Sequence, residues 1–186
     1  NGEVWTPVAS PTYARGSVTF TTGPTATSAT VYCYKPSGNA LGYCDDLAVA
    51  EWTPLVSNGG FESGDLGMWS TWGGAQVVAG NARTGSYALQ VGPGQSSAEQ
   101  VVPVQPNTTY TVSGWARSVD PSEPIRIGVK DFGGAGEVWA PVASSTYAMG
   151  SVSFTTGPTA TSATVYCYKP SGNALGYCDD LAVSSP

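Results

Sequence analysis

Short stretches in which hydrophobic and polar residues alternate recur along the second half of the chain. In the stretch TYTVSGWARS, Tyr110, Val112 and Ala116 share one parity, while Trp115 and Arg117 share the other. Because successive side chains of a strand point to opposite faces, this period of two predicts β-strands with one face in a core. The strands are expected at residues 86–91, 98–104, 109–117, 125–132, 150–156, 162–168 and 177–183.

Turn-forming residues separate these stretches, and no stretch shows the sustained 3.6-residue period of a helix. The chain has 24 Gly and 14 Pro among 186 residues, a composition that suits short strands joined by turns. Many short strands without helices predict an all-β fold, here a β-sandwich of the jelly-roll type.

Residues 2–49 repeat residues 136–183 at an offset of 134, and only four of the 48 aligned positions differ. Nothing before residue 50 corresponds to residues 52–135. We therefore expect residues 1–50 to be the C-terminal half of a preceding tandem module, and residues 52–186 to be one complete module.

The half-module at residues 1–50 carries hydrophobic strands that it has no means of burying alone. Three partners are open at this point: a separate N-terminal half, another copy of the chain, or the N-terminal half in this chain, in competition with residues 136–183. Unpaired strand edges of this length favour association.

The four cysteines form two pairs with one spacing, Cys33 with Cys44 and Cys167 with Cys178. No C-x-x-C motif is present, so zinc or redox chemistry is not expected. A local disulfide in each repeat is the simplest interpretation, and buried free thiols are the alternative. Disulfides indicate an oxidising, extracellular location, so we expect a secreted protein.

The formal net charge is −6 and the chain has no His. This balance argues against nucleic acid and anionic membrane surfaces as partners. Without His, a bound metal would be a hard cation held by oxygen ligands. Trp and Tyr together number 16, and such amphipathic rings bind sugars as well as fill cores.

The last predicted strand, GYCDDLAV, delivers two adjacent carboxylates. Simple alternation places Tyr177, Asp179 and Leu181 on the core side and Cys178 on the other. A buried Asp is costly unless it is paired or bound to a cation. The parity of Cys178 does not match that of Cys167, so the disulfide requires a bulge or a twist in this strand.

Three segments carry a resemblance to a known group of proteins. LVSNGGFESGDLGMWSTWGG is followed by GNARTGSYALQV, and the chain closes on GYCDDLAV. In this order, and together with TYTVSGWAR, they resemble carbohydrate-binding modules of the broad group that includes families 4, 9, 16 and 22. The resemblance covers residues 55–183, and the loop between the two cysteines departs from the common pattern.

The resemblance implies one structural Ca²⁺ that joins the first and last strands. Backbone carbonyls near Gly60 and in residues 81–84 would complete its shell of six to eight oxygens. The alternative is that the two aspartates cap turn amides or are solvated. The side chains implied as ligands are Glu62, Asn81, Asp179 and Asp180.

The resemblance also implies a sugar site built from aromatic and cationic side chains. Trp69 is expected to pack against the core, whereas Trp72 is expected to be a sugar platform. Trp115 has an alternative role as a structural residue covered by a loop. The residues expected to bind carbohydrate are Trp72, Trp115, Arg117, Arg126, Lys130, Trp139 and Tyr168.

No catalytic constellation is evident, because adjacent aspartates on a strand point to opposite faces and a glycosidase needs two facing carboxylates. We therefore expect a non-catalytic carbohydrate-binding module that binds a polysaccharide and belongs to a secreted glycan-degrading enzyme. The alternative is a structural or adhesive repeat of a cell-surface protein. Exposed aromatics on one face favour the first, and aromatics buried between modules favour the second.

Overall fold

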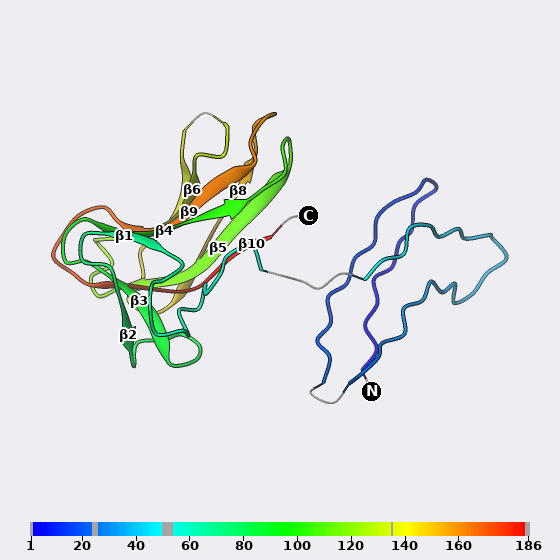
Figure 1. The fold of residues 1–186 in the computed structure, drawn as a ribbon, viewed down its shortest axis with the longest axis horizontal. Helices are drawn as coiled ribbons and strands as arrows, with labels where there is room; N and C mark the ends of the chain where they lie inside the picture. Colours follow the sequence, from blue (N-terminus) through cyan, green and yellow to red (C-terminus); the bar gives the residue numbers. More distant parts are fainter. Residues whose placement is uncertain (1, 24–25, 50–53, 135, 185–186) are drawn as a thin grey trace. The chain divides into compact units, whose positions relative to one another are not determined.

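The computed structural model describes residues 2–23, 26–49, 54–134 and 136–184. The chain divides into two units, Asn1–Thr53 and Pro54–Pro186. The expected boundary between residues 50 and 52 falls outside the described residues. Within the second unit, ten strands form two antiparallel five-stranded sheets and no helix is present among the described residues (Figure 1). The predicted all-β sandwich is confirmed, and we call residues 54–134 and 136–184 the β-sandwich.

The first sheet, sheet A, has the strand order β1-β4-β9-β6-β7. Its central strand β9 pairs with β4 on one side and with β6 on the other. The strands of sheet A are β1 (Ser70–Trp72), β4 (Ser96–Pro103), β6 (Ile125–Lys130), β7 (Val138–Val142) and β9 (Ser162–Lys169).

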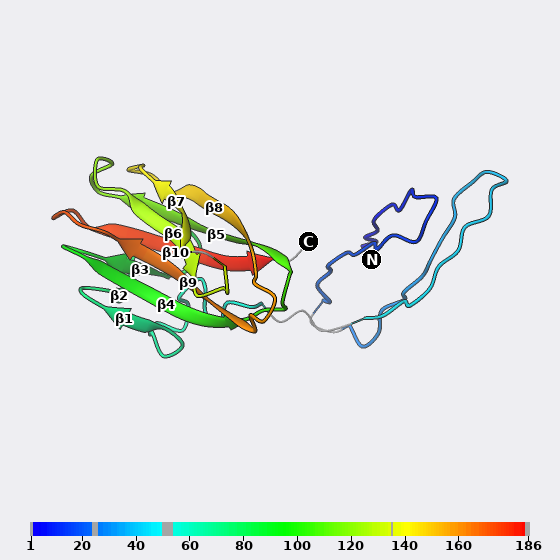
Figure 2. The same ribbon diagram turned by 90° about the horizontal axis from the view of Figure 1, so that it is seen from above.

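The second sheet, sheet B, has the strand order β2-β3-β10-β5-β8. Its central strand β10 pairs with β3 and β5, so the last strand of the chain lies inside the sheet (Figure 2). The strands of sheet B are β2 (Gln76–Ala79), β3 (Tyr87–Val91), β5 (Thr109–Ser118), β8 (Ala148–Thr155) and β10 (Gly176–Ser184).

The core lies between the two sheets and follows from the alternation in the sequence. Val112 of β5, Ile127 of β6 and Val165 of β9 are fully buried. Trp69 also packs into the core, where its ring lies 5.3 Å from that of Phe61 and its indole N–H donates to the Asn58 carbonyl. The expectation that Trp69 is a core residue is confirmed.

The strand β10 departs from simple alternation. Its pairing with β5 shifts register between Asp179 and Ala182, and Asp180 has a φ of 51°. This bulge places Cys178 in the core with Leu181, because it changes which side of the strand faces inward. The predicted common face for Tyr177, Asp179 and Leu181 is therefore wrong, and the bulge that the disulfide required is present.

Both predicted disulfides form, Cys33–Cys44 in the first unit and Cys167–Cys178 in the second. Cys167 lies on β9 of sheet A and Cys178 on β10 of sheet B. The second bridge therefore links the central strands of the two sheets through the core.

Seven strands were expected in the β-sandwich and ten are present. The alternation did not reveal β1, β2 and β7, which are three to five residues long and mostly exposed or half-buried. Such strands bury little hydrophobic surface, and their pairing to β4, β3 and β6 defines them. No helix in the described part of the chain is long and apolar enough to cross a bilayer.

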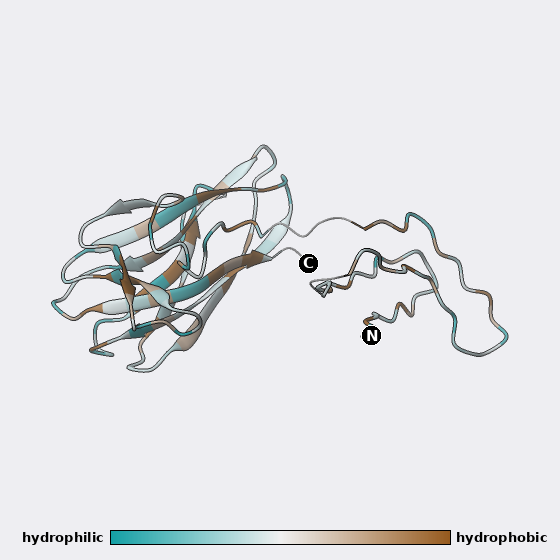
Figure 3. Ribbon diagram, turned by 60° about the horizontal axis from the view of Figure 1, so that its bottom comes forward, coloured by the Kyte–Doolittle hydropathy of each residue, from teal (hydrophilic) through white to brown (hydrophobic). Residues whose placement is uncertain are grey.

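The described residues of the first unit, which we call the N-terminal segment, form no strand or helix. Hydrophobic residues are distributed along the segment (Figure 3). Trp5 and Leu41 are among the exposed ones, and no described residue between 2 and 49 is buried. The segment therefore has no hydrophobic core of its own.

Candidate functional site

Aromatic and polar side chains cross the outer face of sheet A from one edge to the other. Strand pairing places Trp72 beside Ser97, Ser97 beside Tyr168, and Tyr168 beside Arg126. A second row runs parallel to the first and contains Glu99, Tyr166, Gly128 and Trp139. We call Trp72, Tyr166, Tyr168 and Trp139 the aromatic stripe.

Trp72 and Tyr168 form one end of the stripe. Their ring centroids lie 5.6 Å apart with an interplanar angle of 45°. The amide nitrogen of Gln95 donates to the Tyr168 hydroxyl at 2.5 Å. Trp72 is exposed on the short edge strand β1, so its ring is available to a ligand.

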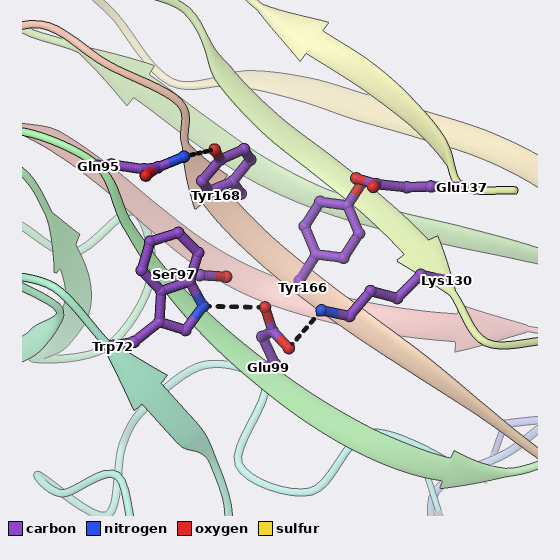
Figure 4. Close-up of a pocket in the computed structure, with 8 residues that line it drawn as sticks. All are labelled: Trp72, Gln95, Ser97, Glu99, Lys130, Glu137, Tyr166 and Tyr168. Carbon is purple, nitrogen blue, oxygen red and sulfur yellow. Dashed lines mark hydrogen bonds and ion pairs between the residues drawn. The ribbon is translucent and has the colours of Figure 1, made fainter.

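Glu99 sits at the centre of the polar contacts. One carboxylate oxygen accepts from the Trp72 indole N–H at 3.1 Å, and the other lies 2.7 Å from the Lys130 ammonium (Figure 4). Burial alone would raise the pKa of Glu99, but the hydrogen bonds from Lys130 and Trp72 outweigh it and hold the pKa below its usual range. Glu99 is therefore an ionised acceptor that fixes both neighbours.

The absence of a side chain at Gly128 leaves room for the Tyr166 ring on the sheet. A Cβ at residue 128 would collide with the Tyr166 ring and come within 2.8 Å of the Trp139 Cβ. The Tyr166 hydroxyl donates to the Glu137 carboxylate. Burial and the hydrogen bond to Glu137 raise the pKa of Tyr166, so its hydroxyl stays a proton donor.

Trp139 and Arg126 form the other end of the stripe. The guanidinium carbon of Arg126 lies 4.0 Å from the Trp139 ring centroid and 5.9 Å from that of Tyr168. Trp139 is exposed and Arg126 is half-buried. This cation–π contact orients both side chains along the sheet face.

Between the aromatic residues the face is hollowed. One hollow has a volume of about 210 Å³, and Figure 4 shows the side chains that line it. A second, of about 190 Å³, includes Val101 and Thr164 and shares Glu99 and Lys130 with the first. The first is lined by Trp72, Gln95, Ser97, Glu99, Lys130, Glu137, Tyr166 and Tyr168.

The structure brings five of the seven predicted sugar-binding residues together and separates two. Trp115 and Arg117 lie on β5 of sheet B, so they do not share a face with the others. Arg83 covers the Trp115 ring at 3.8 Å, and Arg117 lies over the ring of Tyr177. The five on sheet A are Trp72, Arg126, Lys130, Trp139 and Tyr168.

The prediction placed residues of both sheets on one face, because alternation shows which side chains point outward but not which sheet carries a strand. Sequence reasoning also missed the polar residues around the hollow. In the stretch SSAEQVVP, Glu99 has the opposite parity to the buried Ala98 and Val102, so alternation was enough to place it outward. Residues that line the hollow and were not predicted are Gln95, Ser97, Glu99, Glu137 and Tyr166.

Two of the acidic residues predicted as Ca²⁺ ligands, Asp179 and Asp180, lie at the β10 bulge beside Gly60. A Cβ on Gly60 would lie 3.5 Å from an Asp180 carboxylate oxygen, 3.8 Å from one of Asp179 and 3.8 Å from the Glu62 Cγ. The backbone at Gly60 therefore faces the carboxylates of Asp179 and Asp180, whereas the Glu62 carboxylate accepts from the backbone N–H groups of Ser86 and Tyr87. Burial, with a contribution from the neighbouring Asp180, raises the pKa of the Asp179 carboxyl, although backbone N–H donors act against it.

Hydrogen-bond donors surround the same carboxylates. Asp179 is fully buried and accepts from the backbone N–H groups of Arg83 and Thr84 at 2.7 and 3.2 Å. Asp180 pairs with the Arg83 guanidinium at 2.8 Å. These bonds leave lone pairs on the carboxylates, so the donor set suits a hard cation.

Asn81 has partners other than the acidic residues. Its side-chain oxygen accepts from Arg117 at 2.7 Å, and its backbone carbonyl accepts from the Tyr147 hydroxyl at 2.6 Å. Burial and the charge of Asp179 raise the pKa of Tyr147 to about 12. Among the described residues, no group of three His, Cys, Asp or Glu has the spacing of a ready metal centre.

Comparison with known proteins agrees with the β-sandwich fold. Residues 53–173 match the model of a family described as a carbohydrate binding domain. The fold and the aromatic face thus define a carbohydrate-binding module, and the chain belongs to this family of carbohydrate-binding domains.

Two curated relatives are enzymes. The chain is 45% identical over 130 residues to a keratan-sulfate endo-1,4-beta-galactosidase of Sphingobacterium multivorum, covering 69% of this chain and 30% of the relative. It is 32% identical over 136 residues to exochitinase 1 of Streptomyces olivaceoviridis, covering 71% and 22%. The chain therefore spans less than a third of the length of either relative.

Solved structures show the same fold. A family 16 carbohydrate-binding module superposes with a TM-score of 0.60 at 23% identity, covering 70% of this chain and 99% of the module. A family 61 module in complex with β-1,4-galactotriose gives 0.57 at 20% identity, covering 73% and 100%. A xylan-binding domain from Paenibacillus barcinonensis gives 0.57 at 20% identity, covering 74% and 97%.

Proposed function

We propose that the β-sandwich binds a polysaccharide along the aromatic stripe on the outer face of sheet A. The observation that carries this proposal is the exposure of Trp72 and Trp139 on the two edge strands of one sheet, with a polar hollow beside the stripe. A structural repeat would bury such rings between modules, so the exposed rings of Trp72 and Trp139 favour binding over the adhesive alternative.

The chemistry of the stripe matches a sugar chain. Flat rings pack against the C–H faces of pyranoses, and the polar groups between them exchange hydrogen bonds with hydroxyls. Gln95 and Lys130 supply donors, and Glu99 and Glu137 supply acceptors. The stripe crosses five strands, so it has room for several sugar units of one chain.

We propose a neutral polymer as the ligand. Of the two cations on this face, Lys130 is neutralised by Glu99 and Arg126 is stacked on Trp139. The carboxylates of Glu137 and Asp131 add negative charge at the two hollows. An anionic polymer would meet this charge without a free cation to offset it.

We propose that this module binds without catalysing. A glycosidase requires a general acid whose pKa is raised beside a second carboxylate. The pKa of Glu99 is lowered by its contacts with Lys130 and Trp72, which is the opposite of that requirement.

The relatives support a role within a larger enzyme. Both are glycan-degrading enzymes by name and are much longer than the matched segment. We propose that the protein is secreted and that the module holds an attached catalytic domain near its polymer. The two disulfides are consistent with an oxidising location.

Isothermal titration with xylan, β-1,4-galactan, chitin oligosaccharides and keratan sulfate tests the proposal. We expect binding to at least one neutral polymer, and Trp72→Ala should weaken it by about tenfold or more, since buried aromatic anchors contribute upwards of about 1.4 kcal/mol. Met149→Ala, on the exposed edge of sheet B, is the control and should bind as the wild type does.

Trp115→Ala distinguishes the two faces. Unchanged affinity in this variant together with loss in Trp72→Ala supports sheet A as the binding face. Loss only in Trp115→Ala would move the site to sheet B, and an absence of binding to every polymer would refute the proposed function.

We also propose a structural Ca²⁺ held by Glu62, Asp179 and Asp180 with carbonyl groups of the neighbouring turns. Support comes from the carboxylates of Asp179 and Asp180 beside Gly60, two residues before Glu62, and from the burial of Asp179. The ion would compensate an acidic pair that has Arg83 as its ion-pair partner. Its role would be to tie the turn at residues 58–62 to the last strand.

A further inference from the structure

The outer face of sheet B carries its own line of polar and aromatic side chains. Strand pairing places Gln76 beside Gln90, Gln90 beside Tyr177, and Tyr177 beside Arg117. Tyr147, which directly precedes the edge strand β8, ends the line, because the Arg117 guanidinium carbon lies 5.6 Å from its ring centroid. We call these residues the sheet B row.

The sheet B row points away from the core. Ala116 and Cys178 lie in the core, so alternation turns their chain neighbours Arg117 and Tyr177 outward. The first member of the row, Gln76, is exposed. The row and the aromatic stripe are therefore on opposite faces of the β-sandwich, with the core between them.

Arg117 is held in place within the row. Its guanidinium carbon lies 4.2 Å from the Tyr177 ring centroid, and one terminal nitrogen donates to the Asn81 side-chain oxygen at 2.7 Å. The side chain is half-buried, so water solvates only part of its charge. These contacts fix the planar guanidinium, which lowers the entropy that it loses when it binds a ligand.

The charge of Arg117 has no carboxylate partner in the described part of the chain, where the salt bridges use other cations. Its partners are neutral, namely the Asn81 amide oxygen and the nearby Tyr147 hydroxyl. A guanidinium carries more N–H groups than these two oxygens engage. The remaining N–H groups can bind an oxyanion through two parallel hydrogen bonds.

The two aspartates of the β10 bulge have partners other than Arg117. Both oxygens of Asp179 accept from backbone N–H groups. Asp180 accepts from the side chains of Arg83 and Thr84, each at 2.8 Å. Arg117 is therefore the cation of this face that a ligand can pair with.

The two faces of the β-sandwich differ in their charged groups. Sheet A presents the carboxylates of Glu99 and Glu137 beside the aromatic stripe, and Glu99 neutralises Lys130. The sheet B row contains a guanidinium and no carboxylate. A ligand with a negatively charged group therefore complements the row and not the stripe.

We propose that the sheet B row is a second saccharide-binding site, which takes an acidic sugar unit through Arg117. The charged group is a carboxylate or a sulfate ester, and the guanidinium binds two of its oxygens. The amides of Gln76 and Gln90 exchange hydrogen bonds with sugar hydroxyls, and the half-buried Tyr147 adds a ring surface. The site lies on a different face from the aromatic stripe and takes a different ligand, so it does not rest on the stripe.

Two pairs of polymers test the proposal: keratan sulfate with its desulfated form, and polygalacturonate with its methyl ester. The members of each pair differ in the oxyanion. Isothermal titration at low ionic strength should show a preference of about tenfold or more for the acidic member of at least one pair, since a hydrogen bond to a charged group contributes at least that much. The preference should shrink as salt is added, because a half-exposed charge is screened.

Variants at Arg117 test the residue. Arg117→Gln should remove the preference for the acidic polymer and leave the affinity for its neutral form unchanged. Arg117→Lys keeps the charge without the planar fork and should retain only part of the preference. Arg15→Gln removes the same charge from the exposed N-terminal segment and is the matched control, which should keep the full preference.

A second position tests the face without disturbing the contacts of Arg117. Met149 is 59% exposed on β8, beside Trp115 and two residues from Tyr147. Met149→Glu places a negative charge there and should weaken binding of the acidic polymer about threefold or more through repulsion. Met149→Gln has nearly the same shape without the charge and should bind as the wild type does.

Equal affinity of the wild-type protein for both members of each pair would overturn the proposal. A preference that Arg117→Gln and Met149→Glu both retain would also overturn it, and one that only Trp72→Ala removes would place the anion on sheet A. A preference within the keratan pair identifies a sulfate ester, and one within the polygalacturonate pair identifies a carboxylate. Binding of the neutral polymers and its loss in Trp72→Ala report on the aromatic stripe separately, so the two proposals can fail independently.

Discussion

Single residues decide what the two special sites of this module can do. Gly128 leaves the space over which the Tyr166 ring lies, and Gly60 faces the carboxylates at the β10 bulge. A side chain at Gly128 would collide with the Tyr166 ring, whereas a Cβ at Gly60 would make ordinary contacts with the two aspartates. At this scale the most specific expectation concerns the acidic residues around Gly60.

Millimolar Ca²⁺ should raise the thermal midpoint of the protein relative to excess chelator. An ion at about one hundred times its Kd stabilises the folded state by about 2.7 kcal/mol when it does not bind the unfolded chain. Differential scanning calorimetry with and without chelator measures the effect. Glu62→Gln should reduce the response, while Asp120→Asn, an exposed acid that accepts from Ser122, should keep it. A wild-type thermal midpoint that is the same with Ca²⁺ and with chelator would contradict the proposed Ca²⁺ site.

At the scale of elements, the two central strands depend on one covalent link. β9 and β10 belong to different sheets, and Cys167–Cys178 joins them across the core. The loop between them is held further by Glu123, which accepts from the N–H groups of Asn173 and Ala174 and pairs with the buried Lys169. These contacts lower the pKa of Glu123, chiefly through Lys169.

Replacing Cys167 and Cys178 by Ala should lower the free energy of unfolding by about 3 kcal/mol, the value expected for closing a loop of this length. Replacing Cys33 and Cys44 by Ala is the matched control and should leave the same transition unchanged, because the first unit has no core to lose. Denaturant unfolding followed by tryptophan fluorescence measures both. Equal losses in the two double variants would mean that the first unit contributes to the same cooperative transition.

At the scale of the whole molecule, nearly identical sequences have two different structures. Residues 136–183 form four strands around a core, whereas residues 2–23 and 26–49 form none. The difference lies in residues 54–134, which supply flanking strands to one copy only. Strand formation here is therefore a tertiary event and not a local one.

Val165→Asp and Val31→Asp make this contrast measurable, since they are the same change in the same local sequence. Val165→Asp buries an unpaired charge and should cost more than about 4 kcal/mol, enough to abolish the folding transition of the second unit. Val31→Asp should shift that transition by less than about 0.5 kcal/mol. Near-UV circular dichroism during heating follows both. Comparable damage from the two changes would show that residue 31 is already in a core.

Prediction from the sequence succeeded where one face of a strand is hydrophobic. The strands containing Val112, Ile127 and Val165 were placed by alternation, and Trp69 was assigned to the core through the family resemblance. It failed for β1, β2 and β7, whose residues are mostly exposed or half-buried, and for the faces of β10, where the bulge at Asp180 changes the parity.

The candidate sugar site was predicted in its residue types and only partly in its arrangement. Trp72 and Tyr168 were expected together and lie 5.6 Å apart. Trp115 was grouped with them because alternation distinguishes inside from outside and does not distinguish one sheet from the other. Glu99 was not predicted, although alternation places it on the outward face. The prediction included only aromatic and cationic residues and no hydrogen-bond acceptors.

The sequence by itself determined the class of fold, the disulfide pairs and the repeat, because alternation, cysteine spacing and identity are local properties of the chain. Only the tertiary structure decided which sheet each outward side chain occupies, where β10 bulges, and which of the two copies is folded. Those outcomes depend on pairing between strands that lie far apart in sequence. A strand's neighbours, rather than its own residues, supply the hydrogen bonds and the buried surface that fix them.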